Sequence, residues 1–211
     1  MLTIATGATN DTRVDGLVLR NGFANSGAAL RISGGSPVVA NCQFFGNNAI
    51  ILGNALYVDA SSTAIITNNY FAANGRELAI PPTGGGAIAF GSANPRIENN
   101  SFVGNRARDG GAIYVVSATG LIAGNWFLNN EAFQNGGALM AFAAAPRVTH
   151  NRFYGNSALL RGGALATVQG GSALLFNNAL LQNRAALVTN EVRGGGGIFV
   201  DAASKIGRAH V

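Results

Sequence analysis

The amino-acid sequence predicts an all-β solenoid, and three observations lead to that class. Thirty glycines and 24 asparagines make up about a quarter of the 211 residues, while only 11% are charged. Glycine and asparagine are both poor helix formers. Equivalent positions of a repeated motif, from Leu19 to Leu180, span 161 residues in six steps, a mean period of 26.8 residues. Short apolar runs separated by Gly, Asn, Ser and Pro fit about three strands per repeat. We therefore expect a right-handed, single-stranded parallel β-helix of about seven coils, each of roughly 25–32 residues.

The first motif reads NxFxxN and places one large apolar side chain in each coil. Its copies lie at 41–47, 68–74, 99–105, 124–130, 150–156 and 177–183, with a weaker first copy at 16–22. We expect the central side chains to stack inside the coil, where burial contributes about 1.5–3 kcal/mol for each of them. The predicted stack consists of Leu19, Phe44, Phe71, Phe102, Phe127, Phe153 and Leu180.

The asparagine that ends this motif is expected to occupy one corner of every coil. There its amide can bond to the equivalent amides of the neighbouring coils and form a ladder. Such a ladder satisfies backbone groups in turns that water does not reach. The predicted ladder consists of Asn47, Asn74, Asn105, Asn130, Asn156 and Asn183.

A second motif, GGAI or a close variant, precedes an apolar strand in each coil. Its copies lie at 27–30, 53–56, 85–88, 110–113, 136–139, 162–165 and 195–198. The glycines indicate a turn that needs positive φ or a close approach of two coils. Pro37, Pro95 and Pro146 precede another predicted strand, where a fixed φ suits a corner.

Together the two motifs resemble the FxxN and GGAI repeats of the chlamydial polymorphic outer-membrane protein family. More broadly, they are similar to repeats in large bacterial surface proteins with right-handed β-helix passengers. The resemblance covers about residues 14–203; residues 85–88 and 110–113 match GGAI to the letter, whereas 53–56 and 180–183 depart from the pattern. It implies an adhesin-like autotransporter passenger that is extracellular or at the outer-membrane surface. The family's C-terminal membrane barrel has no counterpart here, so we expect a fragment of a longer polypeptide.

We divide the chain into three segments. Residues 1–13 form a lead-in, expected to be an incomplete coil; 14–204 form the β-helix; and 205–211 (KIGRAHV) match the translation of a common sequencing-library adapter, which suggests a non-native tail. Without this tail, 12 arginines stand against nine acidic residues, and the net charge falls from +5 to +3. No apolar run reaches the roughly 18 residues needed to span a bilayer, and the N-terminus lacks the pattern of a signal peptide.

The ionisable residues do not form a pattern typical of catalysis. Asp59 and Asp201 share a repeat position, but five coils separate them by roughly 24 Å, too far for paired carboxylate chemistry. We interpret Cys42 as a small buried thiol and His150 as a turn substitute for asparagine. Arg96, with a neighbouring glutamate, follows a proline and is interpreted as structural or solvated. We therefore predict no catalytic, cofactor or metal site.

Two long excursions, 75–84 and 184–194, leave the repeat from the same corner. Insertions on one face of a solenoid often carry binding specificity, although tolerated variation in loop length is the more ordinary interpretation. The candidate partner-binding residues on this corner are Arg76, Glu77, Arg106, Arg108, Arg161, Arg184, Glu191 and Arg193. They would contact a host or environmental glycan or protein.

The sequence leaves two functions open. The leading hypothesis is a non-catalytic structural or adhesive segment of a large bacterial cell-surface or secreted protein. The alternative is a fragment of a carbohydrate-active β-helix enzyme, a polysaccharide lyase or hydrolase. Nucleic-acid binding is disfavoured because the arginines are dispersed and no exposed aromatic residues interleave with them.

Overall fold

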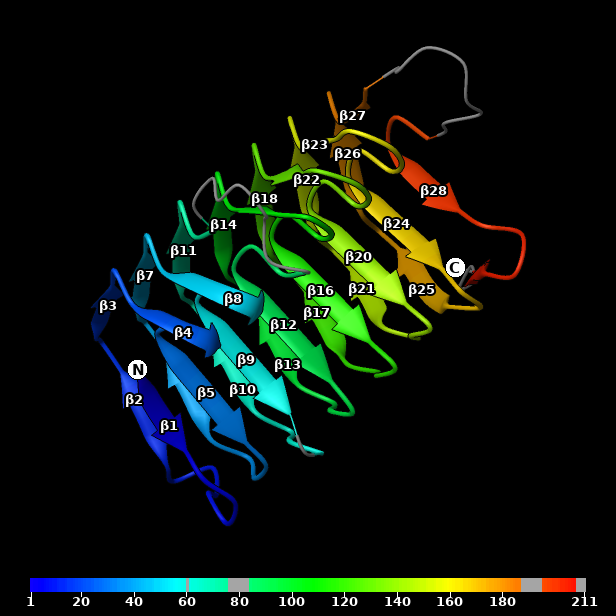
Figure 1. The fold of residues 1–211 in the computed structure, drawn as a ribbon. Helices are drawn as coiled ribbons and strands as arrows, with labels where there is room; N and C mark the ends of the chain where they lie inside the picture. The colour runs from blue at the N-terminus through cyan, green and yellow to red at the C-terminus, as the bar shows by residue number, and fades with distance from the viewer. Residues whose placement is uncertain (60, 76–83, 187–194, 208–211) are drawn as a thin grey trace.

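The computed structural model describes residues 1–59, 61–75, 84–186 and 195–207, and these form a right-handed parallel β-helix. Figure 1 shows successive coils stacked side by side from the N-terminal end of the chain to its C-terminal end. All strand pairs are parallel, and each strand pairs with its equivalent in the next coil. The predicted class and coil number, about seven, are confirmed.

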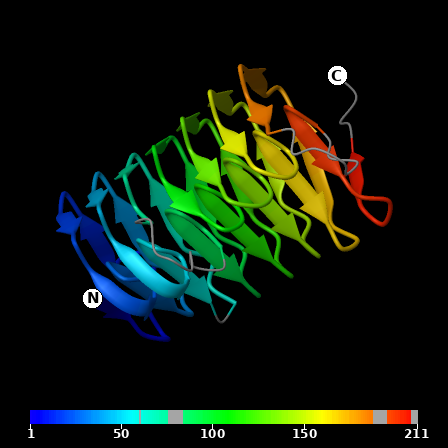
Figure 2. The same ribbon diagram turned by 45° about the horizontal axis from the view of Figure 1, so that its top comes forward.

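Two eight-stranded sheets and one seven-stranded sheet form the walls of the coil, and the turned view of Figure 2 shows their strands aligned from coil to coil. Sheet A contains β1 (Leu2–Ile4), β5 (Leu30–Ser33), β9 (Leu56–Asp59), β12 (Ile88–Gly91), β16 (Ile113–Val116), β20 (Leu139–Phe142), β24 (Leu165–Val168) and β28 (Ile198–Val200). Sheet B contains β2 (Arg13–Asp15), β6 (Val38–Ala40), β10 (Ile65–Thr67), β13 (Arg96–Glu98), β17 (Leu121–Ala123), β21 (Arg147–Thr149), β25 (Ser172–Phe176) and β29 (Lys205–Gly207). Sheet C contains β3 (Val18–Arg20), β7 (Gln43–Phe45), β11 (Tyr70–Ala72), β14 (Ser101–Val103), β18 (Trp126–Leu128), β22 (Arg152–Tyr154) and β26 (Ala179–Leu181).

Two smaller sheets lie between sheets C and A along the chain. Sheet D contains the two-residue strands β15 (Arg106–Ala107), β19 (Glu131–Ala132), β23 (Ser157–Ala158) and β27 (Arg184–Ala185). The remaining pair is β4 (Phe23–Ser26) with β8 (Asn48–Leu52). Strand β1 lies in the predicted lead-in and β29 in the predicted tail, and each pairs with a strand of the repeat. The origin of the tail stays a prediction.

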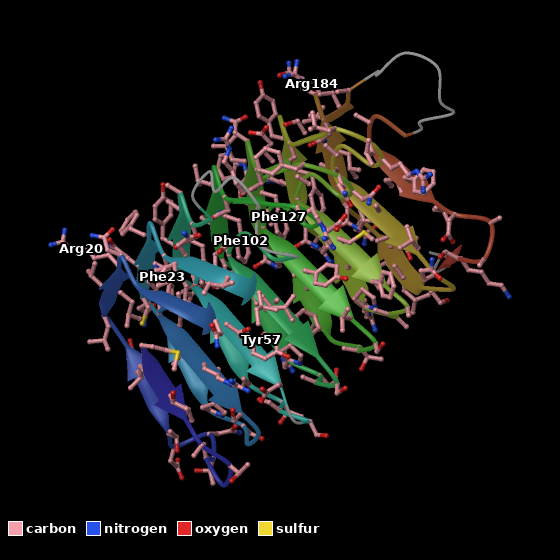
Figure 3. All side chains as sticks on the ribbon, in the orientation of Figure 1. Arg20, Phe23, Tyr57, Phe102, Phe127 and Arg184 are labelled. Carbon is pink, nitrogen blue, oxygen red and sulfur yellow. The ribbon has the colours of Figure 1, made fainter. Side chains whose placement is uncertain are left out.

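The middle residue of each sheet C strand points inward and forms the aromatic stack. Consecutive rings from Phe44 to Phe153 lie 4.5, 5.0, 4.9 and 4.6 Å apart, with interplanar angles between 3° and 9°. This spacing matches the distance between neighbouring strands, so the register of the sheet itself sets the ring contacts. Leu19 and Leu180 extend the stack at its two ends and are partly buried. Figure 3 labels Phe102 and Phe127 within this column.

The corner asparagines are buried and bond to one another from coil to coil. In each successive pair from Asn47 to Asn183, the side-chain nitrogen Nδ2 of one amide donates to Oδ1 of the next at 2.9–3.0 Å. The same nitrogen also donates to the carbonyl oxygen of the stacked residue in the preceding coil, such as Phe71 for Asn105. Both N–H bonds of each inner amide are therefore used, as burial requires.

A second ladder lies at the preceding corner, between sheets B and C. Its members are Asn69, Asn100, Asn125, Asn151 and Asn178. Cys42 occupies the equivalent position one coil earlier, is buried, and its backbone N–H donates to Asn69 Oδ1 at 2.9 Å. His150 precedes Asn151 with a φ of 56°, in the left-handed region that Asn99 occupies in its own coil. The interpretations of Cys42 as a buried thiol and His150 as a turn residue agree with these positions.

Candidate functional site

The predicted partner-binding corner coincides in part with sheet D. Arg106 and Arg184 begin strands β15 and β27, so both belong to a sheet, although Arg184 opens the excursion predicted at 184–194; their role in binding stays a prediction. The register of sheet D aligns Arg106 with Glu131, and Ser157 with Arg184. The guanidinium of Arg106 contacts the Glu131 carboxylate at 2.6 Å. Two-residue strands carry too little sequence pattern to be recognised in advance.

Two other described arginines of this corner, Arg108 and Arg161, also have partners within the protein. Arg108 Nε donates to Asp109 at 3.2 Å. The guanidinium carbon of Arg161 lies 4.9 Å from the centroid of the Phe199 ring. Arg184 is exposed, and Figure 3 shows it projecting away from the coil. Arg76, Glu77, Glu191 and Arg193 lie outside the described residues.

The acidic residues of sheet A are separated as expected. Asp59 ends β9, whereas Asp201 follows β28, five strands further along the sheet. Asp59 pairs with Arg31 at 2.7 Å, and the Arg31 guanidinium lies 5.6 Å from the Tyr57 ring centroid. Burial raises the pKa of Tyr57, and the nearby Asp59 carboxylate raises it further. Oδ1 of Asp59 is buried and has no hydrogen-bond partner among the described residues.

Sheet B shows similar internal pairing. Arg96 contacts Glu98 at 3.0 Å, and the Arg147 guanidinium lies 4.6 Å from the Phe176 ring centroid. The part of the chain that the structure describes has no group of three His, Cys, Asp or Glu residues able to hold a metal ion. The charged side chains of sheets A and B are thus largely satisfied by neighbours, and they leave few groups directed at a ligand.

The outward face of sheet C differs from those of sheets A and B, and neither sequence motif identifies it as a site. Its side chains come from the first and third residues of seven three-residue strands. The first column contains Val18, Gln43, Tyr70, Ser101, Trp126, Arg152 and Ala179. The second column contains Arg20, Phe45, Ala72, Val103, Leu128, Tyr154 and Leu181. Neither column contains an acidic residue.

Trp126 and Arg152 are direct neighbours in the register of this face. Trp126 is 49% exposed, a large fraction for the largest apolar side chain in the protein. Two hollows adjoin the pair, and both are lined by it. One has a volume of about 220 Å³ and also contacts Gly124, Asn125 and His150. The other has a volume of about 290 Å³ and also contacts Phe153, Tyr154, Ala179 and Leu181.

A larger open groove, about 500 Å³, runs along the corner between sheets A and B. It is lined by small side chains, including Ser61, Ser92 and Ser117, and by no charged residue among those described. Without a charged or aromatic group, this groove offers little to orient a ligand. The outward face of sheet C is therefore the candidate functional site.

These features define a right-handed parallel β-helix repeat protein whose interior is a stack flanked by two amide ladders. The family model for the right-handed β-helix region matches residues 5–185, and the chain belongs to this family. No curated protein and no solved structure gives a significant match. Among the described residues, no helix is long and apolar enough to cross a membrane.

Proposed function

We propose that the chain is a non-catalytic structural and adhesive segment of a large bacterial cell-surface or secreted protein. The observation that carries this proposal is the uninterrupted interior: aromatic contacts run from Phe44 to Phe153, and ladder contacts run from Asn47 to Asn183. Such coupling of every coil to the next produces a stiff rod. A stiff rod suits a segment that holds a binding surface away from a cell.

The resemblance to the polymorphic outer-membrane protein repeats supports the same proposal. It favours an extracellular passenger whose remaining chain supplies export and attachment. We also propose that residues 205–211 derive from a library adapter. Sequencing the uninterrupted reading frame on both sides would test both points: a continuous native frame through residue 211 would contradict the adapter origin.

A fragment of a polysaccharide lyase or hydrolase is the second candidate. One observation favours it: Arg31, Tyr57 and Asp59 cluster on the outward face of sheet A, and one buried oxygen of Asp59 has no hydrogen-bond partner among the described residues. Arginine and carboxylate groups can serve charge neutralisation or proton transfer on an acidic sugar. The pairing of Asp59 with Arg31 argues against this role because it already satisfies one carboxylate oxygen.

The deciding experiment combines a binding assay with a turnover assay on the same protein. A polysaccharide panel is tested for retention of the protein and, in parallel, for new reducing ends or unsaturated uronides. Retention without turnover supports the adhesive role. Turnover that is lost in the Asp59→Ala variant but kept in the matched exposed variant Asp11→Ala would overturn the adhesive role. Loss of retention on shortening residues 75–84 would place the contact at the predicted corner.

A further inference from the structure

Arg152 differs from most other arginines of the described chain in having no internal partner. Ion pairs to acids engage five arginines, and aromatic rings engage two more: Arg13, Arg31, Arg96, Arg106, Arg108, Arg147 and Arg161. Within the described residues, Arg20, Arg152 and Arg184 have no such contact. Of these three, only Arg152 is a register neighbour of an exposed tryptophan. An uncompensated guanidinium beside an exposed indole is a combination that binds planar or ring-shaped anions.

The shape of the surface sets the size of the ligand. The two hollows, about 220 and 290 Å³, are close to the lower end of small-ligand sites. Trp126 and Arg152 line both hollows, so the pair lies between them on one continuous surface. A ligand of several linked rings could place one ring in each hollow. A folded protein partner would instead need roughly 800 Å² of contact on its own side.

The charge of the surface sets the chemistry of the ligand. Neither outward column of sheet C contains an acidic side chain, so Arg152 presents its charge without competition from that face. The face holds a second arginine, Arg20, but β3 and β22 are five strand spacings apart, roughly 24 Å. Nucleic-acid binding relies on many phosphate contacts along a strand. A single accessible guanidinium fits a ligand with one anionic group at this point.

We propose that Trp126 and Arg152 form a binding site for an oligosaccharide that carries a carboxylate or sulfate group. The apolar face of one sugar ring packs on the Trp126 indole, and the anionic group accepts hydrogen bonds from the Arg152 guanidinium. Tyr154 supplies a polar contact in one flanking hollow, whereas His150 lines the other with both ring nitrogens already bonded, to Thr149 and Asn177. This inference rests on the proposed adhesive role and names the class of ligand through which that role is exerted.

The protein contains a single tryptophan, so its intrinsic fluorescence reports directly on this site. The full chain is titrated with a hyaluronan tetrasaccharide, which carries carboxylates, and a neocarratetraose sulfate, which carries sulfate. Cellotetraose serves as the neutral sugar and tetraglutamate as the acidic non-sugar. We expect one or both anionic sugars to change the fluorescence emission of Trp126 and to reduce its quenching by acrylamide. Equal binding of cellotetraose or tetraglutamate would overturn the proposal.

Substitutions then locate the contact. Arg152→Gln should weaken binding about tenfold or more, as expected for loss of a charged hydrogen bond, and Arg152→Lys should restore part of it. Trp126→Ala, measured by calorimetry, should weaken binding similarly. Arg20→Gln is the matched control, because it removes the same charge from the same face and should leave binding unchanged. If anionic sugars bind equally to Arg152→Gln and wild type, this site is excluded while the adhesive role stands. If the sugars are cleaved, the adhesive role itself fails.

Discussion

Asn105 donates a hydrogen bond from its side-chain nitrogen to the carbonyl oxygen of Phe71, one coil earlier, at 3.0 Å. This contact couples the two interior systems, since Phe71 belongs to the aromatic stack and Asn105 to the ladder. The same nitrogen donates to Asn130 Oδ1 at 3.0 Å, and Asn105 Oδ1 accepts from the backbone and side chain of Asn74. One amide therefore satisfies four hydrogen-bonding groups that are shielded from water.

Replacing Asn105 with alanine is expected to destabilise the protein strongly. The substitution removes the side-chain donor to the Phe71 carbonyl and the acceptor for the Asn74 backbone N–H and for one Asn74 side-chain N–H, and each unsatisfied buried group costs about 1–3 kcal/mol. We expect a total loss of several kcal/mol in the free energy of unfolding, measured by urea denaturation followed by circular dichroism. The control is Asn99→Gly, which alters an exposed asparagine at a positive φ that glycine also adopts. A loss no larger than that of the control would show that the ladder is not stabilising.

Removing one ring from the middle of the stack should open a cavity that neighbouring coils cannot fill. Phe102 is fully buried and lies 5.0 Å from the Phe71 ring and 4.9 Å from the Phe127 ring. Phe102→Ala should cost about 3–5 kcal/mol. The matched variant Leu180→Ala removes a partly buried end member and should cost clearly less. Equal losses of stability in the two variants would mean that the extent of burial does not determine how much a stack residue stabilises the protein.

Gly104, in the NxFxxN motif, and Gly111, in the GGAI motif, should respond very differently to an added methyl group. At Gly111, a Cβ atom would overlap the carbonyl oxygen of Gly137 and that of Glu131 in the next coil. At Gly104, φ is +59° but no atom lies within 4 Å of a new Cβ. Gly104→Ala should therefore cost about 1–2 kcal/mol, the cost of a left-handed conformation.

Gly111→Ala should cost more than Gly104→Ala, because only a separation of adjacent coils would relieve the overlap with two backbone oxygens. Thermal denaturation of the two variants, side by side, gives the order of the two effects. The reverse order would show that the contact between coils is not what makes glycine necessary at position 111.

The interior could be predicted from the sequence because it repeats the same residue type in every coil. Phe44, Phe71 and Phe102 lie in equivalent motif positions, and the parallel register then stacks them without further information.

The second ladder was missed for a geometric reason. In the doublet Asn99–Asn100 only the second residue turns inward, and composition does not reveal which asparagine adopts a positive φ.

The outward face of sheet C could not be recognised from repetition, since its residues differ from coil to coil. Trp126 and Arg152 nevertheless occupy the same position in successive copies of NxFxxN, immediately before Phe127 and Phe153. An alignment of the copies would have placed them side by side. The sequence could not show that most other described arginines are paired internally while Arg152 has no such contact among the described residues, because those partners are set by three-dimensional contacts.

Cys42 supplies the last prediction, which concerns pH. Its thiol is buried and donates to the Ala40 carbonyl oxygen at 3.1 Å. Burial is the main reason that the pKa of Cys42 lies above its ordinary value. The folded protein therefore retains the thiol proton at a pH where the unfolded chain has released it. Unfolding releases a proton in that range, so the free energy of unfolding should fall as pH rises above about 8.5.

Two measurements check this expectation. The native protein should react slowly with a disulfide reagent such as DTNB at pH 8, whereas the urea-unfolded protein should react rapidly, because the thiolate is the reactive form. Urea denaturation of wild type and Cys42→Ala between pH 8 and 9.5 should show a shallower decline in the variant. The range ends below pH 10 because burial also raises the pKa of Tyr57 and Tyr114, whose proton release would add to the decline. Parallel declines in the two proteins would show that Cys42 does not contribute to the pH dependence.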